Sequence, residues 1–277
     1  MLSPETQFLI DFNCHLVPAA LGVPVSSAAG ASMFGISEAE FLAHLEQVDR
    51  QVWATAARLL AEESVATALD RWQVPGAGTV MFVGDSITTY RLGYARLIAA
   101  MAGLRHPQLF FHNVAQSGYT STHGLEATFT QFLAHQPDWV FIKFGANDCK
   151  QLGGPQARTL VSLEEYRANM AAIVFAFKHF SQAQIVLISP SPVVEPVVNS
   201  YPAFLPMRMT WDNQNLRACA DVVRELAARH VLPFIDLFSA LGSSPDPVHY
   251  LPDGLHPGPA GHEIIARHVL QTLDGSP

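Results

Sequence analysis

From Gly78 onward, short runs of β-branched and aromatic residues alternate with longer amphipathic segments. The short runs predict strands over residues 79–83, 109–113, 139–144, 184–189 and 232–236. The longer segments predict helices over residues 90–103, 125–135, 163–180, 211–230 and 259–273. Residues 185–188 are apolar at every position, which is typical of a strand covered on both faces. The alternation therefore predicts an α/β fold, with a parallel sheet between two layers of helices.

The chain before this region has a different pattern. Ser37 is followed three residues later by Glu40, a capping-box pattern that predicts the start of a helix-rich stretch ending near Trp72. Residues 1–36 carry little periodicity, so we expect an irregular arm with at most one short helix there. The sequence thus predicts a helical N-terminal extension over residues 1–75 and a main domain over residues 76–277.

Composition excludes several classes of partner. The chain has 277 residues, 49% of them hydrophobic, which is enough for a large core without disulfide staples. Lys and Arg number 16 against 24 Asp and Glu, so the formal charge is -8. This balance lacks the positive field that binds nucleic acids or anionic membranes, and we expect neither partner.

The spacing of the cysteines and the length of the apolar runs indicate the cellular compartment of the protein. Cys14, Cys149 and Cys219 have no CxxC spacing, which disfavours a disulfide framework and a zinc site and is consistent with reduced thiols in the cytoplasm. No basic segment followed by a long apolar run opens the sequence, and no stretch reaches the roughly 18 apolar residues of a membrane span. We therefore expect a cytoplasmic protein.

Polar clusters follow the predicted strands and recur near the C-terminus. They are the segments 84–87 (Gly-Asp-Ser-Ile), 113–118 (Asn-Val-Ala-Gln-Ser-Gly), 145–148 (Gly-Ala-Asn-Asp) and 253–256 (Asp-Gly-Leu-His). In open α/β sheets, ligands bind beyond the carboxyl ends of the strands. We therefore expect the clusters to meet at one edge of the sheet.

Three of these residues suit nucleophilic catalysis. Serine is a weak nucleophile until a neighbouring base accepts its proton, and His256 is the candidate base for Ser86. Asp253, three residues before His256, is placed to fix the imidazole tautomer and stabilise the imidazolium. Acyl transfer also requires hydrogen-bond donors about 3 Å from the developing oxyanion.

The four clusters resemble the blocks of the SGNH (GDSL-type) hydrolases over about residues 79–273. The resemblance implies a three-layer α/β/α sandwich with a five-stranded, flavodoxin-like parallel sheet. It also implies the catalytic triad Ser86, Asp253 and His256, and an oxyanion hole formed by the backbone N–H groups of Ser86 and Gly118 and the side-chain amide of Asn147. Ile87 departs from the pattern, which has Leu there, and Ala115 stands where Gly is frequent.

Other residues near the clusters have less specific roles. Tyr90, Tyr119 and Thr120 are candidates for lining the substrate cleft. Asp85 and Asp148 are expected to accept hydrogen bonds from nearby backbone N–H groups, as turn residues do. Residues 191–209 contain four prolines and no regular pattern, so they form either a substrate wall or ordinary surface packing.

Competing motifs are incomplete in this sequence. There is no Gly-x-Ser-x-Gly elbow, which disfavours the α/β-hydrolase class proper. His262 and Glu263 begin an HExxH-like pattern, but Ala266 occupies the position of the second histidine. The glycines at 76 and 78 precede a strand, whereas a dinucleotide fingerprint follows one. We therefore expect neither a metal nor a cofactor.

These observations favour a serine esterase that forms an acyl-enzyme and acts on short-chain or acetyl esters of carbohydrates or small molecules. One alternative is a thioesterase or lysophospholipase for longer acyl chains, and another is a non-catalytic ligand-binding module. The sequence leaves the oligomeric state open. It also leaves open whether the apolar side chains of the extension cover the sheet, form a lid or build an oligomer interface; these are Phe8, Leu9, Phe12, Phe34 and Phe41.

Overall fold

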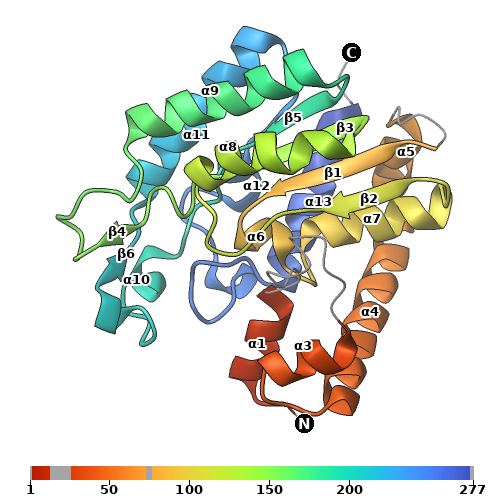
Figure 1. Ribbon diagram of the computed structural model, residues 1–277, viewed down its shortest axis with the longest axis horizontal. Coiled ribbons are helices and arrows are strands. Elements are labelled where there is room, and N and C mark those ends of the chain that lie inside the picture. The colour runs from red at the N-terminus through yellow and green to blue at the C-terminus, as the bar shows by residue number, and fades with distance from the viewer. Residues whose placement is uncertain (1, 13–25, 73–76, 275–277) are drawn as a thin grey trace.

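The computed structural model describes residues 2–12, 26–72 and 77–274 (Figure 1). The features noted above at Cys14 and at Gly76 lie outside these residues. No helix within the described ranges is both long enough and apolar enough to cross a membrane.

A five-stranded parallel sheet forms the centre of the molecule, as the sequence predicts. Its spatial order is β2-β1-β3-β5-β7, and every neighbouring pair is parallel. The strands are β1 (Thr79–Gly84), β2 (Phe110–Asn113), β3 (Trp139–Lys143), β5 (Gln184–Ile188) and β7 (Phe234–Ile235). All five carboxyl ends therefore lie at the same edge, and the shortest strand, β7, covers only two of the residues predicted for it.

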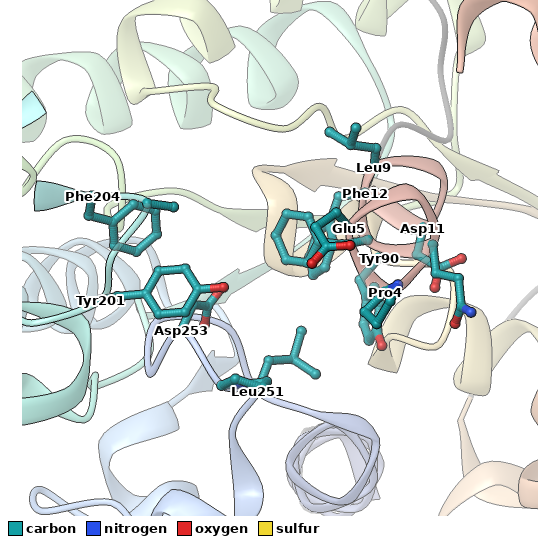
Figure 2. Close-up of a pocket in the computed structure, with 14 residues that line it drawn as sticks. Pro4, Glu5, Leu9, Asp11, Phe12, Tyr90, Tyr201, Phe204, Leu251 and Asp253 are labelled. Carbon is teal, nitrogen blue, oxygen red and sulfur yellow. The ribbon is translucent and has the colours of Figure 1, made fainter. Parts of the chain in front are cut away.

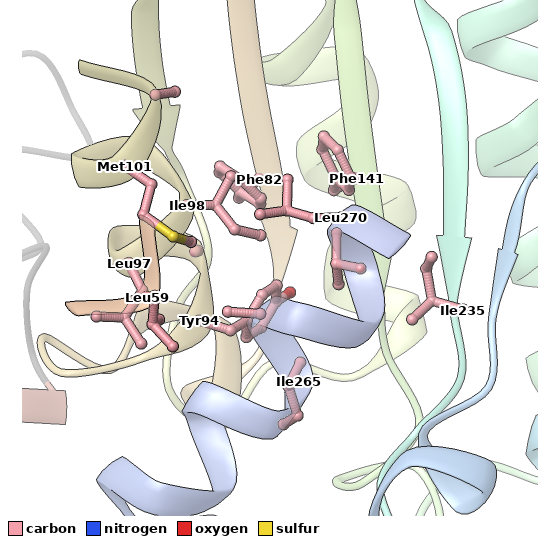
Figure 3. Packing of buried hydrophobic residues seen from close by; sticks show 14 of the residues in the cluster. Leu59, Phe82, Tyr94, Leu97, Ile98, Met101, Phe141, Ile235, Ile265 and Leu270 are labelled. Atoms are coloured by element: carbon pink, nitrogen blue, oxygen red, sulfur yellow. The ribbon is translucent and has the colours of Figure 1, made fainter. Parts of the chain in front are cut away.

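Helices cover both faces of the sheet (Figure 1). The principal ones after β1 are α7 (Tyr94–Arg105), α8 (Ser121–Thr130), α9 (Leu163–Phe180), α11 (Asn213–His230) and α13 (Pro259–Asp274). Alternate residues of β1 point to opposite faces, so Phe82 packs with α7 and α13 (Figure 3) while Met81 packs with α9 and α11. This arrangement is the predicted three-layer sandwich.

Shorter elements occupy the connections. They are α6 (Ser86–Thr89), α10 (Glu195–Val198), α12 (Leu237–Leu241), the 3-10 turns η1 (Phe132–His135), η2 (Leu205–Met207) and η3 (Pro247–His249), and the two-stranded pair β4 (Gln151–Leu152) and β6 (Met209–Thr210). The segment 191–209 therefore contains two short helical turns and the start of β6, where the sequence showed no regular pattern.

The N-terminal extension is more helical than predicted. It contains α1 (Pro4–Phe12), α3 (Ser27–Met33), α4 (Glu38–Leu60) and α5 (Glu63–Arg71). The expectation of at most one short helix before residue 37 was wrong, because Ser26 caps α3 by accepting a hydrogen bond from Ala29 N at 3.2 Å and alanine favours helix. The capping box at Ser37 and Glu40 is confirmed.

The helices α4 and α5 share a hydrophobic core with the sheet. Leu59, Leu69 and Trp72 belong to the same buried cluster as Phe82 and Phe141. Arg267 of α13 also donates two hydrogen bonds to Glu62, at 2.7 and 2.8 Å. These two helices are therefore integral to one face of the sandwich.

Two glycines offer a matched test of packing near the site. A Cβ at Gly124 of α8 would lie 2.4 Å from the ring of Phe144, whereas one at Gly103 of α7 would meet its nearest neighbour, Trp53, at 3.7 Å. We expect Gly124→Ala to lower the free energy of unfolding by about 1–3 kcal/mol through overpacking. The control Gly103→Ala should leave it unchanged or raise it by up to about 1 kcal/mol. Urea unfolding measures both, and equal effects would contradict this packing.

Candidate active site

Ser86 lies at the carboxyl end of β1, where it begins α6. Asp85 caps this helix, its Oδ1 accepting a hydrogen bond from Ile87 N at 3.1 Å, as expected for a turn carboxylate. A Cβ at Gly84 would lie 2.6 Å from both Lys143 O and Thr88 Oγ1. Only glycine therefore allows the strand to turn this closely against β3 and hold Ser86 half-buried at the sheet edge.

A chain of hydrogen bonds links the three residues predicted as a triad. Ser86 Oγ lies 2.9 Å from His256 Nε2. On the other side of the ring, His256 Nδ1 lies 2.6 Å from Asp253 Oδ2. This arrangement fits a base that accepts the serine proton and a carboxylate that holds the base in the required tautomer.

Asp253 is held as a carboxylate by its own loop. Its Oδ1 accepts hydrogen bonds from the backbone N–H groups of Leu255 at 2.9 Å and His256 at 3.0 Å. Burial alone raises the pKa of this carboxyl, but the hydrogen bonds and the attraction of His256 outweigh it, so its pKa is lowered from the usual value. The charge needed to stabilise an imidazolium is therefore present at neutral pH.

The predicted oxyanion donors border the same cavity as the triad serine and histidine. This cavity of about 220 Å³ is lined by Ser86, Gly118, Asn147 and His256 among others. Gly118 has a φ of +84°, a conformation that favours glycine. Asn147 Nδ2 donates to Tyr119 O at 3.0 Å, which fixes the orientation of the amide beside the cavity.

The remaining wall of this cavity includes Lys150, Met209 and Trp211. Of these three residues, the sequence indicated only Met209, which ends segment 191–209. Trp211 Nε1 donates to Ala146 O at 2.8 Å, so the indole is tied to the Asn147 segment. Burial lowers the pKa of Lys150 from its usual value. Lys150 lies three residues after Asn147, and Trp211 lies two residues before Asn213. Neither position belongs to a sequence motif.

A layer of buried charge lies beneath the nucleophile. Lys143 Nζ is 3.2 Å from both carboxylate oxygens of Asp85, and neither side chain is exposed to solvent. Asp148 accepts hydrogen bonds from Ser121 N at 2.9 Å and Ser121 Oγ at 2.5 Å. Asp148 thus bonds a backbone N–H as expected, but one 27 residues away in the chain. The sequence indicated this layer of buried charge only through Lys143, a charged residue within an otherwise apolar predicted strand.

The three candidate substrate residues are placed differently. Tyr90 is buried and lines a second cavity, where its ring stacks on Phe12 with the centroids 4.5 Å apart. The Thr120 hydroxyl is directed at His123 Nδ1, 2.8 Å away, where it caps α8. The Tyr119 ring stacks on His123 with the centroids 5.1 Å apart. Tyr119 and Thr120 line neither of the two cavities described for this site.

The second cavity, of about 500 Å³, adjoins the first (Figure 2). Phe8, Phe12 and Phe204 line both. In Figure 2, residues of α1 form one side, Tyr201 and Phe204 form the opposite side, and Leu251 lies below. Segment 191–209 therefore does supply part of the cleft wall.

Other groups with possible chemistry are inert in this arrangement. Burial lowers the pKa of His262 to about 3, and its Nδ1 accepts a hydrogen bond from Tyr94 N at 3.1 Å. Cys149 and Cys219 are buried free thiols. Within the described ranges, no group of three or more His, Cys, Asp or Glu side chains is placed to hold a metal ion.

Comparison with protein families identifies one match. The model of the GDSL-like lipase/acylhydrolase family matches residues 82–264. The acetylxylan esterase of Geobacillus stearothermophilus is 27% identical over 222 residues, covering 70% of this chain and 93% of that protein. The isoamyl acetate-hydrolyzing esterase 1 homolog of Homo sapiens is 29% identical over 140 residues, covering 50% of this chain and 56% of that protein. The chain thus matches just over half of the human relative.

Solved structures share the fold. LAE5, an alpha/beta hydrolase enzyme from the metagenome of Lake Arreo, superposes with a TM-score of 0.58 at 22% identity, covering 73% of this chain and 97% of that chain. A catalytic mutant of Axe2, an acetylxylan esterase from Geobacillus stearothermophilus, gives a TM-score of 0.57 at 23% identity, covering 73% and 96%. Both confirm the predicted fold class.

The buried Asp148 predicts a pH dependence of stability. Burial, with a smaller contribution from the charge of Asp85, raises its pKa from 3.8 to about 6, although Ser121 opposes the shift. A raised pKa means that the folded state binds the proton more tightly than the unfolded state. The stabilising effect of protonation is therefore complete below pH 3.8 and is lost as the pH rises through about 6.

We expect the free energy of unfolding of the wild type, relative to Asp148→Asn, to be higher at pH 5 than at pH 7.5 by on the order of 1 kcal/mol. Urea titrations of both proteins at the two pH values measure the difference. A constant difference, or one that grows with pH, would contradict the assignment.

Proposed function

Because the chain belongs to the GDSL-like lipase/acylhydrolase family, we propose that it hydrolyses carboxylic esters with Ser86, His256 and Asp253 as its catalytic triad. Ser86 Oγ attacks the ester carbonyl while His256 Nε2 accepts its proton, and His256 then donates that proton to the leaving alkoxide. Water activated by the same imidazole hydrolyses the acyl-enzyme. The observation that carries the proposal is the continuous chain Ser86–His256–Asp253, with links of 2.9 and 2.6 Å.

Three donors are proposed to stabilise the oxyanion: the N–H groups of Ser86 and Gly118 and the amide of Asn147. All three residues line the cavity that contains the reacting serine. Because Asn147 is tethered through Tyr119 O, its second N–H is oriented before the substrate arrives. Such preorganised donors stabilise the transition state without the cost of reorienting water.

The acyl group is proposed to be short, with acetyl as the principal case. The cavity on the oxyanion side measures about 220 Å³, and Met209 and the tethered indole of Trp211 line it. Two relatives have names that refer to acetyl esters, an acetylxylan esterase and an isoamyl acetate-hydrolyzing esterase homolog. We therefore propose acetate esters of carbohydrates or small molecules as the substrate class.

The alternatives are less well supported. A lysophospholipase or long-chain thioesterase binds a long acyl chain, whereas the cavity at Gly118 and Asn147, where we place the acyl group, is the smaller of the two. A non-catalytic binding module has no use for a hydrogen-bonded proton relay. Ester hydrolysis of short acyl groups accounts for both observations.

The domain division and the location are proposed on the same basis. We propose residues 76–277 as the hydrolase domain, which the family match at 82–264 supports, and residues 1–75 as an extension, of which α4 and α5 pack against the sheet. We propose the cytoplasm as the location, supported by the free thiols of Cys149 and Cys219. The formal charge of -8 disfavours nucleic-acid partners.

Two variants test the proposed roles. Ser86→Ala removes the nucleophile and should lower kcat for p-nitrophenyl acetate by about 10³-fold or more. Asn147→Ala removes one oxyanion donor and should lower kcat about 10²-fold, with a smaller change in KM. Circular dichroism confirms folding of each variant, and a folded Ser86→Ala protein with full activity would refute the mechanism.

Acyl-chain length tests the substrate class. We expect kcat/KM for p-nitrophenyl esters to fall steeply beyond C2 to C4, because we place the acyl group in the smaller cavity, which Trp211 lines. A profile that rises through C8 to C12, by up to about 0.8 kcal/mol of transition-state binding per methylene, would instead support the long-chain alternative.

A further inference from the structure

The two cavities share the wall formed by Phe8, Phe12 and Phe204 but differ in the rest of their lining. Gly118 and Asn147, the proposed oxyanion donors, line only the smaller cavity. Asp253 and the adjoining Leu251 and Pro252, from the loop that carries His256, line only the larger one. Ser86 and His256 themselves line the smaller cavity, and Phe8 and Phe12, which line both cavities, contact the His256 ring. Since His256 must donate its proton to the leaving alkoxide, the alcohol part of the ester lies beside this ring, against Phe8 and Phe12.

We propose that α1 forms one wall of the leaving-group pocket and that Phe8 and Phe12 select esters of uncharged, apolar alcohols. This inference rests on the ester hydrolysis proposed above. It assigns a role to a helix that precedes the residues matched to the family, 82–264. Phe8 and Phe12 are thus specificity-determining residues outside the four polar clusters that resemble the family's blocks.

The helix α1 is anchored beside the triad by several contacts. Arg91 Nε donates to Ile10 O at 3.1 Å, and Arg91 N donates to Asp11 O at 3.0 Å. The Asp11 carboxylate lies 2.8 Å from His44 Nε2 of α4, a buried pair. Ser117, the residue before Gly118, donates its hydroxyl to Phe12 O. The wall is therefore connected to both the core and the oxyanion side of the site.

The aromatic rings of α1 touch the catalytic imidazole. The centroid of Phe12 lies 4.6 Å from that of His256, and Phe8 meets the same ring edge-on at 5.8 Å. Phe8 is 40% exposed, which leaves part of its ring uncovered by protein and available to a ligand in the cavity it lines. Burying such apolar surface against an alkyl or aryl alcohol is favourable.

The charges of the pocket restrict the alcohol further. Glu5, Asp11 and Asp253 line it, and no lysine or arginine does so among the residues that the structure describes. The carboxylates of Asp11 and Asp253 already bind His44 and His256, so their engaged oxygens do not serve a sugar hydroxyl. An anionic alcohol, such as a phosphorylated one, meets only negative charge here.

The test holds the acyl group constant and varies the alcohol. We expect Phe8→Ala to lower kcat/KM for benzyl acetate about tenfold but that for ethyl acetate less than about twofold, because only the benzyl group reaches the α1 wall. Phe12→Leu, which keeps the core filled, should shift the same ratio in the same direction. The control Phe129→Ala removes a phenylalanine of α8 that is 56% exposed and lines neither cavity, and it should leave the ratio unchanged.

A charged substrate provides a second readout. The wild type should prefer benzyl acetate over 4-(acetoxymethyl)benzoate by about tenfold at low salt, and the preference should shrink at 0.5 M NaCl as the carboxylates are screened. Equal rates for the two esters, or a Phe8→Ala variant with an unchanged benzyl-to-ethyl ratio, would overturn the inference.

Ser86→Ala, assayed alongside, separates the two levels of the proposal. If it retains activity on both esters, ester hydrolysis by this triad fails. If it is inactive while Phe8→Ala and Phe12→Leu keep the wild-type ratio, only the role of α1 fails.

Discussion

The hydrogen bond between Ser86 Oγ and His256 Nε2 joins two segments that are 170 residues apart in sequence. It can form only because β1 ends at the same edge of the sheet as its parallel neighbours, with Ser86 leaving that edge and the His256 loop returning to it. Proton transfer along this chain requires the side chains to be held within about 0.5 Å of their working positions. The chemistry therefore requires a rigid parallel sheet with well-packed cores on both faces. The cores formed around Phe82 and Met81 supply that rigidity.

The buried pair of Lys143 and Asp85 lies beneath this edge and connects β3 to the turn that carries Ser86. A fully buried pair such as Lys143 and Asp85 loses hydration that its attraction repays only in part, so it contributes little to stability compared with apolar residues. The same Asp85 carboxylate caps Ile87 N and so shapes the turn that presents Ser86. We infer that Lys143 fixes this carboxylate and, through it, the nucleophile. Asp148, the residue after Asn147, is a second buried carboxyl and accepts a hydrogen bond from Ser121 N.

Local patterns were sufficient to predict the layers and the reactive clusters. Residues 185–188 signal a buried strand by themselves, and Asp253 and His256 are separated by a single turn. The alanine-rich run that forms α3 lacked hydrophobic periodicity, so its helix was missed although its serine cap is local. The pairing of Lys143 with Asp85 and the docking of α1 on Arg91 depend on tertiary packing between distant segments, which no single stretch of sequence encodes. The substrate wall was therefore the least predictable part of the site.

Activation of one serine by one imidazole is the central claim, and covalent labelling tests it most directly. Intact-protein and peptide mass spectrometry after treatment with a fluorophosphonate should show a single adduct on Ser86, formed much more slowly in His256→Ala. An unmodified, folded wild-type protein, or an adduct confined to another serine, would contradict the assignment of this site.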